Sequence, residues 1–143
     1  IKSSAASDVY KRQENIRVGC NYINGSYEAG YVFDFDAVAG PYRKSRGYKD
    51  SPVLINGESV AGSGGGTCQV STTLYNAILQ IPISVIKTQV HSSYGISYVP
   101  LDMDAAVGAG NLDLRLQNTL PYDVRFALQA VGGVLTVRVY RAS

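Results

Sequence analysis

Cys68 and His91 are the residues of this 143-residue chain that could carry out nucleophilic chemistry. Cys68 directly follows the glycine-rich run 62–67, and His91 is the only histidine. Apolar residues at three- and four-residue steps over 70–78 predict a helix, with Thr67 placed to cap its first turn and Cys68 as its first residue. There, unpaired backbone N–H groups and the positive end of the helix dipole favour the thiolate over the thiol, and a neighbouring imidazolium would add to the effect. The arrangement suits acyl transfer through a thioester.

The glycines before Cys68 fit the same chemistry. They leave room for a substrate backbone to approach closely, and such a turn can aim N–H groups at a developing oxyanion. A structural interpretation stays open beside it, because glycine-rich turns are common before helices and free cysteines are often buried. A Cys20–Cys68 disulfide also stays open. Cys20, however, lies between Ile16 and Ile23 in a short helical pattern, which is typical of a buried apolar residue.

Composition limits the remaining possibilities. The length is that of one domain, large enough to bury a core without metal or disulfide staples. With 13 Lys and Arg against 11 Asp and Glu, the net charge of +2 gives no reason to expect a nucleic-acid partner. Two cysteines and one histidine without closely spaced pairs do not resemble a zinc site, so we expect no metal and no cofactor. No apolar stretch is long enough to span a membrane, and no secretory signal pattern opens the chain.

Two segments need separate interpretation. The basic run 43–46, with Lys49 nearby, is expected to be a solvated loop, with the alternative that it receives the carboxylates of an anionic substrate. Residues 1–13 lack clear periodicity, and we expect them to be a non-native or disordered lead before a single domain over 14–143. Because the chain begins at Ile1 without a methionine, we expect it to be a piece of a longer protein.

The hydrophobic pattern predicts an α+β domain. The expected elements before residue 100 are a short helix over 14–24, strands over 31–35, 83–90 and 94–99, and a hairpin over 53–60 turning at Asn56-Gly57. Apolar and polar residues then alternate over 112–117, 123–128 and 135–140, with turn residues at 118–121 and at Gly132-Gly133. We therefore expect an antiparallel sheet packed by one principal helix, which carries Cys68 at its N-terminus, together with a short N-terminal helix.

Residues 64–77 read GGGTCQVSTTLYNA, and this stretch resembles the signature GGGxCQVSxTLYNA of the VanW family. That family is named for a protein of vancomycin-resistance clusters and occurs in bacterial cell-wall proteins. The resemblance extends over nearly everything from Asn15 onward. Supporting matches are Ile23-Asn24-Gly25, Val32-Phe33 with Phe35, Gly40-Pro41, Gly47-Tyr48-Lys49, Asn56-Gly57, His91-Ser92, Tyr98-Val99-Pro100 and Asp104-Ala105.

The resemblance implies peptidoglycan L,D-transpeptidase activity. Cys68 would attack the carbonyl between the third and fourth residues of a stem tetrapeptide, release D-alanine and form a thioester, which the side-chain amine of another stem would resolve. His91 would be the general base and acid, and Asp104 is the candidate that orients its imidazole. The resemblance also implies oxyanion or substrate contacts from four residues: Gly65, Gly66, Gln69 and Ser92.

The resemblance further implies peptidoglycan stem peptides as partners and an extracytoplasmic, cell-surface location. We expect no membrane contact by this domain, although the parent protein could be anchored. The chain departs from the family pattern at Ala29, at Asp34 and Asp36 around Phe35, and at Tyr42, which displaces an expected arginine to position 43. A substrate role for Arg43 is therefore in doubt. A non-catalytic wall-binding or scaffolding module, and a cysteine peptidase with water as acceptor, stay open as alternatives.

Overall fold

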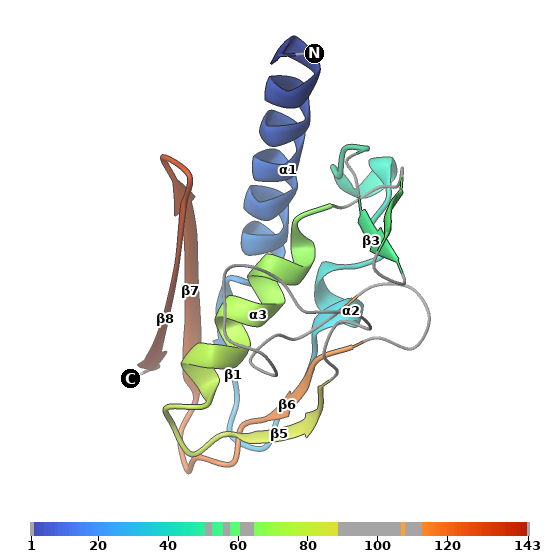
Figure 1. Cartoon of the computed structure of the whole chain (residues 1–143). Coiled ribbons are helices and arrows are strands. Elements are labelled where there is room, and N and C mark those ends of the chain that lie inside the picture. Colours follow the sequence, from blue (N-terminus) through green and yellow to red (C-terminus); the bar gives the residue numbers. More distant parts are fainter. Residues whose placement is uncertain are drawn as a thin grey trace.

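A computed structural model describes residues 2–50, 53–55, 58–60, 65–88, 107 and 113–142. Its helical elements are α1 (Lys2–Ile23), α2 (Phe35–Ala39), the 3-10 turn η1 (Lys44–Arg46) and α3 (Thr67–Ile78). Its strands are β1 (Gly25–Tyr27), β2 (Val32–Asp34), β3 (Val53–Ile55), β4 (Glu58–Val60), β5 (Ser84–Lys87), β6 (Arg115–Gln117), β7 (Val124–Val131) and β8 (Val134–Arg141). The fold is α+β, as the hydrophobic pattern predicts (Figure 1).

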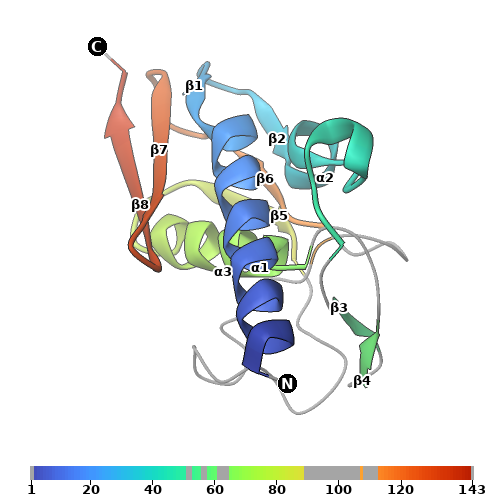
Figure 2. The same cartoon turned by 90° about the horizontal axis from the view of Figure 1, so that it is seen from above.

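The described strands form antiparallel sheets in the orders β1-β7-β8 and β2-β6-β5, and β3 pairs with β4 as a separate ribbon. In both views α1 stands between the long β7–β8 ribbon and α2 (Figures 1 and 2). α1 contacts β7, α2 and α3, while α3 contacts β8. The principal helices therefore join the sheet of β7 and β8 to the rest of the domain.

The hydrophobic core contains side chains from the three α-helices and from several strands. The apolar stripe of α3 is fully buried at Val70, Leu74 and Ile78, which confirms the periodicity argument for this helix. These side chains belong to one core cluster, whose other buried members are Ile16, Cys20, Ile23, Phe33, Phe35, Ala39, Ile83, Val107, Leu114, Leu116, Val124, Phe126 and Leu128. Cys20 is 2% exposed, so its interpretation as a buried apolar residue is confirmed.

Both predicted hairpins are confirmed by their registers. Ile55 pairs with Glu58, so two residues connect β3 to β4. Val131 pairs with Val134 across Gly132-Gly133, and both glycines have positive φ, 59° and 77°. Side chains other than glycine rarely adopt two such angles in succession, which is why a Gly-Gly pair between alternating strands is a strong hairpin signal.

The prediction that the last three strands share one sheet is wrong. β6 lies between β2 and β5, whereas β7 and β8 pair with β1. The reason is the corner at Asn118, whose side-chain amide donates to the carbonyls of Tyr27, Glu28 and Tyr122 while its Oδ1 accepts from the N–H of Leu120. These bonds turn the chain from one sheet into the other, so residues 118–121 do not form a hairpin.

The N-terminal half contains two further differences. α1 begins at Lys2 instead of near Glu14, so the helix includes most of the segment predicted to be a lead; whether that segment is native stays a prediction. The expected strand over 31–35 stops at Asp34, and a helix that the sequence did not predict, α2, follows. Asp34 caps it by accepting from the N–H of Ala37 at 3.2 Å, and the buried carboxylate of Asp113 accepts from the N–H of Asp36 at 3.1 Å. The predicted strand over 94–99 lies outside the described residues.

Candidate active site

Cys68 is the second residue of α3, and the turn before it differs from the one predicted. The residue that caps the helix is Gly66, in the left-handed region with φ 109°, and no side chain caps the first turn. Thr67 lies within the helix and is 6% exposed. The prediction that Thr67 caps the helix is therefore wrong, because the left-handed turn at Gly66 begins the helix one residue earlier.

The thiol of Cys68 is half-buried and contacts backbone polar groups. Its Sγ lies 3.4 Å from both the N–H and the carbonyl oxygen of Val107, so the sulfur can accept from one and donate to the other. Val107 is buried and comes three residues after Asp104 in the chain. Asp104, the predicted orienting carboxylate, lies outside the described residues.

Gly65 and Gly66 are buried against α1. A Cβ on Gly66 would lie 2.9 Å from the carbonyl oxygen of Arg12 and 3.1 Å from a side-chain carbon of Ile16. Together with the positive φ, this close approach requires glycine at position 66. The absence of a side chain at Gly66 therefore allows the start of α3 to pack closely against α1.

Asn15 is a site-positioning residue that sequence reasoning missed. Its side chain is fully buried on α1, and its Nδ2 donates to the carbonyl oxygens of Gly65 and Lys49, both at 3.0 Å. Its Oδ1 accepts from the N–H of Lys49 at 2.7 Å. One amide thus ties the end of the glycine run to the loop after η1. The sequence marks Asn15 only as the residue at which the family resemblance begins, and it gives no sign that the side chain is buried.

We predict that Asn15→Ala lowers the free energy of unfolding by about 1–3 kcal/mol, because it removes the partner of the buried carbonyl of Gly65 and of the part-buried backbone groups of Lys49. Chemical denaturation measures this loss. Arg17→Ala, an exposed position on the same helix, serves as the control and should change stability by no more than about 0.5 kcal/mol. A loss for Asn15→Ala no larger than that of the control would contradict the positioning role.

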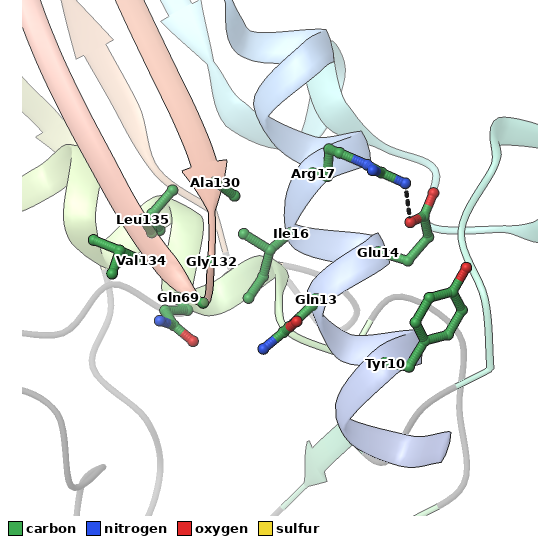
Figure 3. Close-up of a pocket in the computed structure, with 11 residues that line it drawn as sticks. Tyr10, Gln13, Glu14, Ile16, Arg17, Gln69, Ala130, Gly132, Val134 and Leu135 are labelled. Carbon is green, nitrogen blue, oxygen red and sulfur yellow. Dashed lines mark hydrogen bonds and ion pairs between the residues drawn. The ribbon is translucent and has the colours of Figure 1, made fainter. Parts of the chain in front are cut away.

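Gln69 points in a different direction from Cys68. Its backbone N–H donates to the carbonyl of Gly66 at 3.1 Å, so this donor is engaged within the turn. Its side chain lines a cavity of about 260 Å³ between α1, the start of α3 and the tip of the β7–β8 ribbon (Figure 3). The apolar part of the lining comes from Ile16, Ala130, Val134 and Leu135, and Glu14 and Arg17 form an ion pair at its α1 side. Cys68 does not line this cavity.

Three predicted site residues, His91, Ser92 and Asp104, lie outside the described residues. The pairing of Cys68 with His91 therefore stays a prediction. Gly65, Gly66, Cys68 and Gln69 are brought together at the start of α3. This part of the site could be predicted from the sequence because its residues all lie within positions 65–69.

The two cysteines differ sharply in environment, and neither forms a disulfide. The alternative of a Cys20–Cys68 disulfide, which the sequence left open, is therefore not realised. Cys20 is enclosed in the core, and burial raises the pKa of its thiol to about 11. We predict that iodoacetamide at pH 8 modifies Cys68 and leaves Cys20 intact. The thiolate is the reactive form, whereas the Cys20 thiol stays protonated at this pH and is closed off from the reagent by the core. Peptide mapping by mass spectrometry reads both positions. Equal modification of the folded protein at both would contradict this assignment.

Two cations of the basic run have local partners. The guanidinium of Arg46 lies 4.0 Å from the centre of the Tyr22 ring and donates to the carbonyl of Val38 at 3.1 Å. Lys44 pairs with Asp50 at 3.1 Å on the surface. Arg46 thus joins the run to α1 and α2, whereas Arg43 and Lys44 are exposed, as expected of a solvated loop.

Within the described ranges, no group of three or more His, Cys, Asp or Glu side chains could hold a metal ion. None of the helices in the described part of the chain has the length and apolar character needed to cross a membrane.

Comparison with known proteins gives consistent matches. The model of a family described as "VanW like protein" matches residues 11–140. The uncharacterized protein YoaR of Bacillus subtilis (strain 168) is 34% identical over 130 residues, covering 90% of this chain and 43% of the relative. The vancomycin B-type resistance protein VanW of Enterococcus faecalis (strain ATCC 700802 / V583) is 28% identical over 109 residues, covering 73% of this chain and 40% of the relative. The chain thus spans less than half the length of either. No solved structure matches it significantly.

Proposed function

The chain belongs to the VanW-like family, and from this premise we propose that it is a peptidoglycan L,D-transpeptidase that acts through a thioester on Cys68. The observation that carries the proposal is the position of Cys68. It is free, half-buried and in the first turn of α3, where backbone N–H groups have no helical partners, whereas the other cysteine is enclosed in the core. A helix start of this kind favours a nucleophilic thiolate.

The proposed reaction has two balanced steps. The Cys68 thiolate attacks the carbonyl carbon between the third and fourth stem residues, and the C–N bond breaks as His91 gives a proton to the departing D-alanine amine. The side-chain amine of a second stem then attacks the thioester and gives up a proton to His91. The C–S bond breaks, and the thiolate is regenerated.

Other residues of the site receive supporting roles in this proposal. Asp104 orients the imidazole of His91. Backbone and side-chain donors of Gly65, Gly66, Gln69 and Ser92 contact the substrate or the oxyanion. The oxyanion contact is assigned to the other three residues, because the N–H of Gln69 is engaged with Gly66 and its side chain lines a cavity that Cys68 does not line.

The proposal extends to location and partners. Stem peptides of peptidoglycan lie outside the cytoplasmic membrane, so the domain would act extracytoplasmically at the cell wall. One relative is named for vancomycin B-type resistance. Remodelling of stem peptides is a chemistry through which a wall protein could affect sensitivity to such an antibiotic.

Mass spectrometry of purified stem tetrapeptide after incubation with the protein tests the proposal. We expect loss of D-alanine together with a cross-linked peptide dimer. Loss of D-alanine without dimer would instead assign a cysteine peptidase with water as acceptor. An unchanged tetrapeptide that still binds the protein would favour a binding module. A parallel incubation with Cys68→Ala identifies any background hydrolysis.

A further inference from the structure

The cavity lined by Gln69 lies next to the proposed nucleophile without containing it. Gln69 directly follows Cys68 in the first turn of α3, and the Cα atoms of adjacent residues lie about 3.8 Å apart. The cavity volume of about 260 Å³ is just below the roughly 300–1,000 Å³ of sites for drug-sized ligands, so it suits a small molecule or part of a longer chain. The cavity is therefore placed and sized to hold a portion of a substrate outside the reacting bond.

The walls of this cavity are apolar where they are most buried. Ile16 is 7% exposed, and Ala130 and Leu135 are half-buried, whereas Gly132 and Gly133 at the hairpin tip are exposed. The cavity thus has an apolar interior from α1, β7 and β8 and an edge that is open to solvent. Small alkyl groups that enter it leave water, which favours their binding.

Two primary amides lie at the same edge of the cavity, from Gln13 on α1 and Gln69 on α3 (Figure 3). The Nε2 of Gln13 lies close to the hairpin tip, where a Cβ on Gly133 would approach it to 3.5 Å. Within the described ranges, neither side-chain amide has a hydrogen-bond partner in the protein. A primary amide both donates and accepts, so this pair matches the N–H and carbonyl of a peptide group.

The lining offers no unpaired charge. Among the described residues around the cavity, Glu14 and Arg17 are the charged ones, and they form an ion pair with each other (Figure 3). A carboxylate or ammonium group of a ligand would therefore leave water without gaining a free opposite charge. An uncharged peptide segment meets no such cost.

We propose that this cavity is a subsite for an uncharged segment of a stem peptide, with a small alkyl side chain, apart from the bond that Cys68 attacks. The alkyl group packs on Ile16 and Leu135. The amides of Gln13 and Gln69 bind the peptide groups beside it. The inference rests on the proposed function in naming the stem peptide as the ligand, and it gives Gln69 a substrate contact that is distinct from the oxyanion.

The side-chain amide signals of the protein give a direct test by NMR. Cys68→Ala protein labelled with ¹⁵N is titrated with stem tetrapeptide, so that no turnover occurs during the measurement. The side-chain NH2 signals of Gln13 and Gln69 should shift with one common Kd, whereas that of Gln129, on the outer face of β7, should not. N-acetylalanine methylamide, a neutral fragment with one small side chain, should shift the same two signals, and zwitterionic alanine should leave them in place.

Variants of the cavity lining provide a second test in the same Cys68→Ala background. Gln69→Leu should raise the Kd of the tetrapeptide about threefold to tenfold, the loss expected of a neutral hydrogen bond, and Gln129→Leu is the matched control without effect. Ala130→Ile should raise the Kd at least about tenfold, because the larger side chain fills part of the cavity. Ala127→Ile makes the same change on the outer face of the same strand and should leave the Kd unchanged.

Absence of tetrapeptide binding would overturn the inference, as would binding that leaves the two glutamine signals in place or equal shifts from alanine and its neutral derivative. If Ala130→Ile does not fold, Gln69→Leu decides, and an unchanged Kd overturns the inference. Binding needs no turnover, so the two proposals are separable. Cavity-dependent binding without release of D-alanine by the unmodified protein would reject the transpeptidase alone, whereas turnover with a KM that Gln69→Leu leaves unchanged would reject the subsite alone.

Discussion

Cys68→Ala is expected to abolish release of D-alanine from stem tetrapeptide while leaving the melting temperature within about 4 °C of the unmodified protein. Without the sulfur no thioester can form. The thermal effect should be small because Sγ is half-buried and its described polar contacts are with the backbone of Val107 alone. Mass spectrometry of the peptide and differential scanning calorimetry measure the two quantities.

Cys68→Ser should be as inactive as the alanine variant, because a hydroxyl has a far higher pKa than a thiol and a helix start that favours a thiolate would not readily ionise it. Cys20→Ala provides the matched control: it removes the enclosed sulfur, so it should lower stability and retain turnover. If Cys68→Ala stayed active, or cost the 2 kcal/mol or more typical of large core truncations, the structural interpretation of the glycine run and Cys68 would be correct.

The elements that the sequence predicted well are those whose signals are local. β7 and β8 alternate strictly and meet at two consecutive glycines, so pattern and turn chemistry agree. The buried stripe of α3 repeats at helical spacing. In each case the residues that determine the structure lie within one turn or one hairpin of one another.

The sheet assignment of β6 was not predictable in this way. Its alternation resembles that of β7 and β8, and the difference lies in Asn118, whose amide binds carbonyls some 90 residues earlier in the chain. α2 was missed for a similar reason. Its cap, Asp34, ends an apolar alternation that reads as a continuing strand, and the supporting carboxylate of Asp113 is remote in sequence.

The same contrast holds for the candidate site. Cys68 and the glycines before it lie within a few positions of one another, so their chemistry can be inferred from the sequence. Asn15 acts through a contact across 50 residues, to the carbonyl of Gly65. A buried asparagine carries no motif of its own, and its role depends on which backbone groups the fold brings beside it.

His91→Ala is expected to reduce turnover of stem tetrapeptide about 10²–10⁴-fold, the range contributed by general acid–base catalysis. In the proposed mechanism the imidazole protonates the departing D-alanine amine and later accepts the proton of the attacking amine. Residual activity should persist because Cys68 keeps its position at the start of α3, where the helix dipole still favours the thiolate. Initial rates of D-alanine release, measured from pH 6 to 9, quantify the loss.

Imidazole added to the His91→Ala protein should restore part of the rate if the missing group is a proton carrier, whereas it should leave Cys68→Ala inactive, since a free base cannot replace the nucleophile. Alkylation of Cys68 in the His91→Ala protein provides a folding control: if the fold is kept, the thiol should still react and Cys20 should not, because Cys20 is enclosed in the core. Full activity of His91→Ala would assign proton transfer to another group. Asp104 would then be the first residue to replace, because it comes three residues before Val107, whose N–H donates to the Cys68 sulfur.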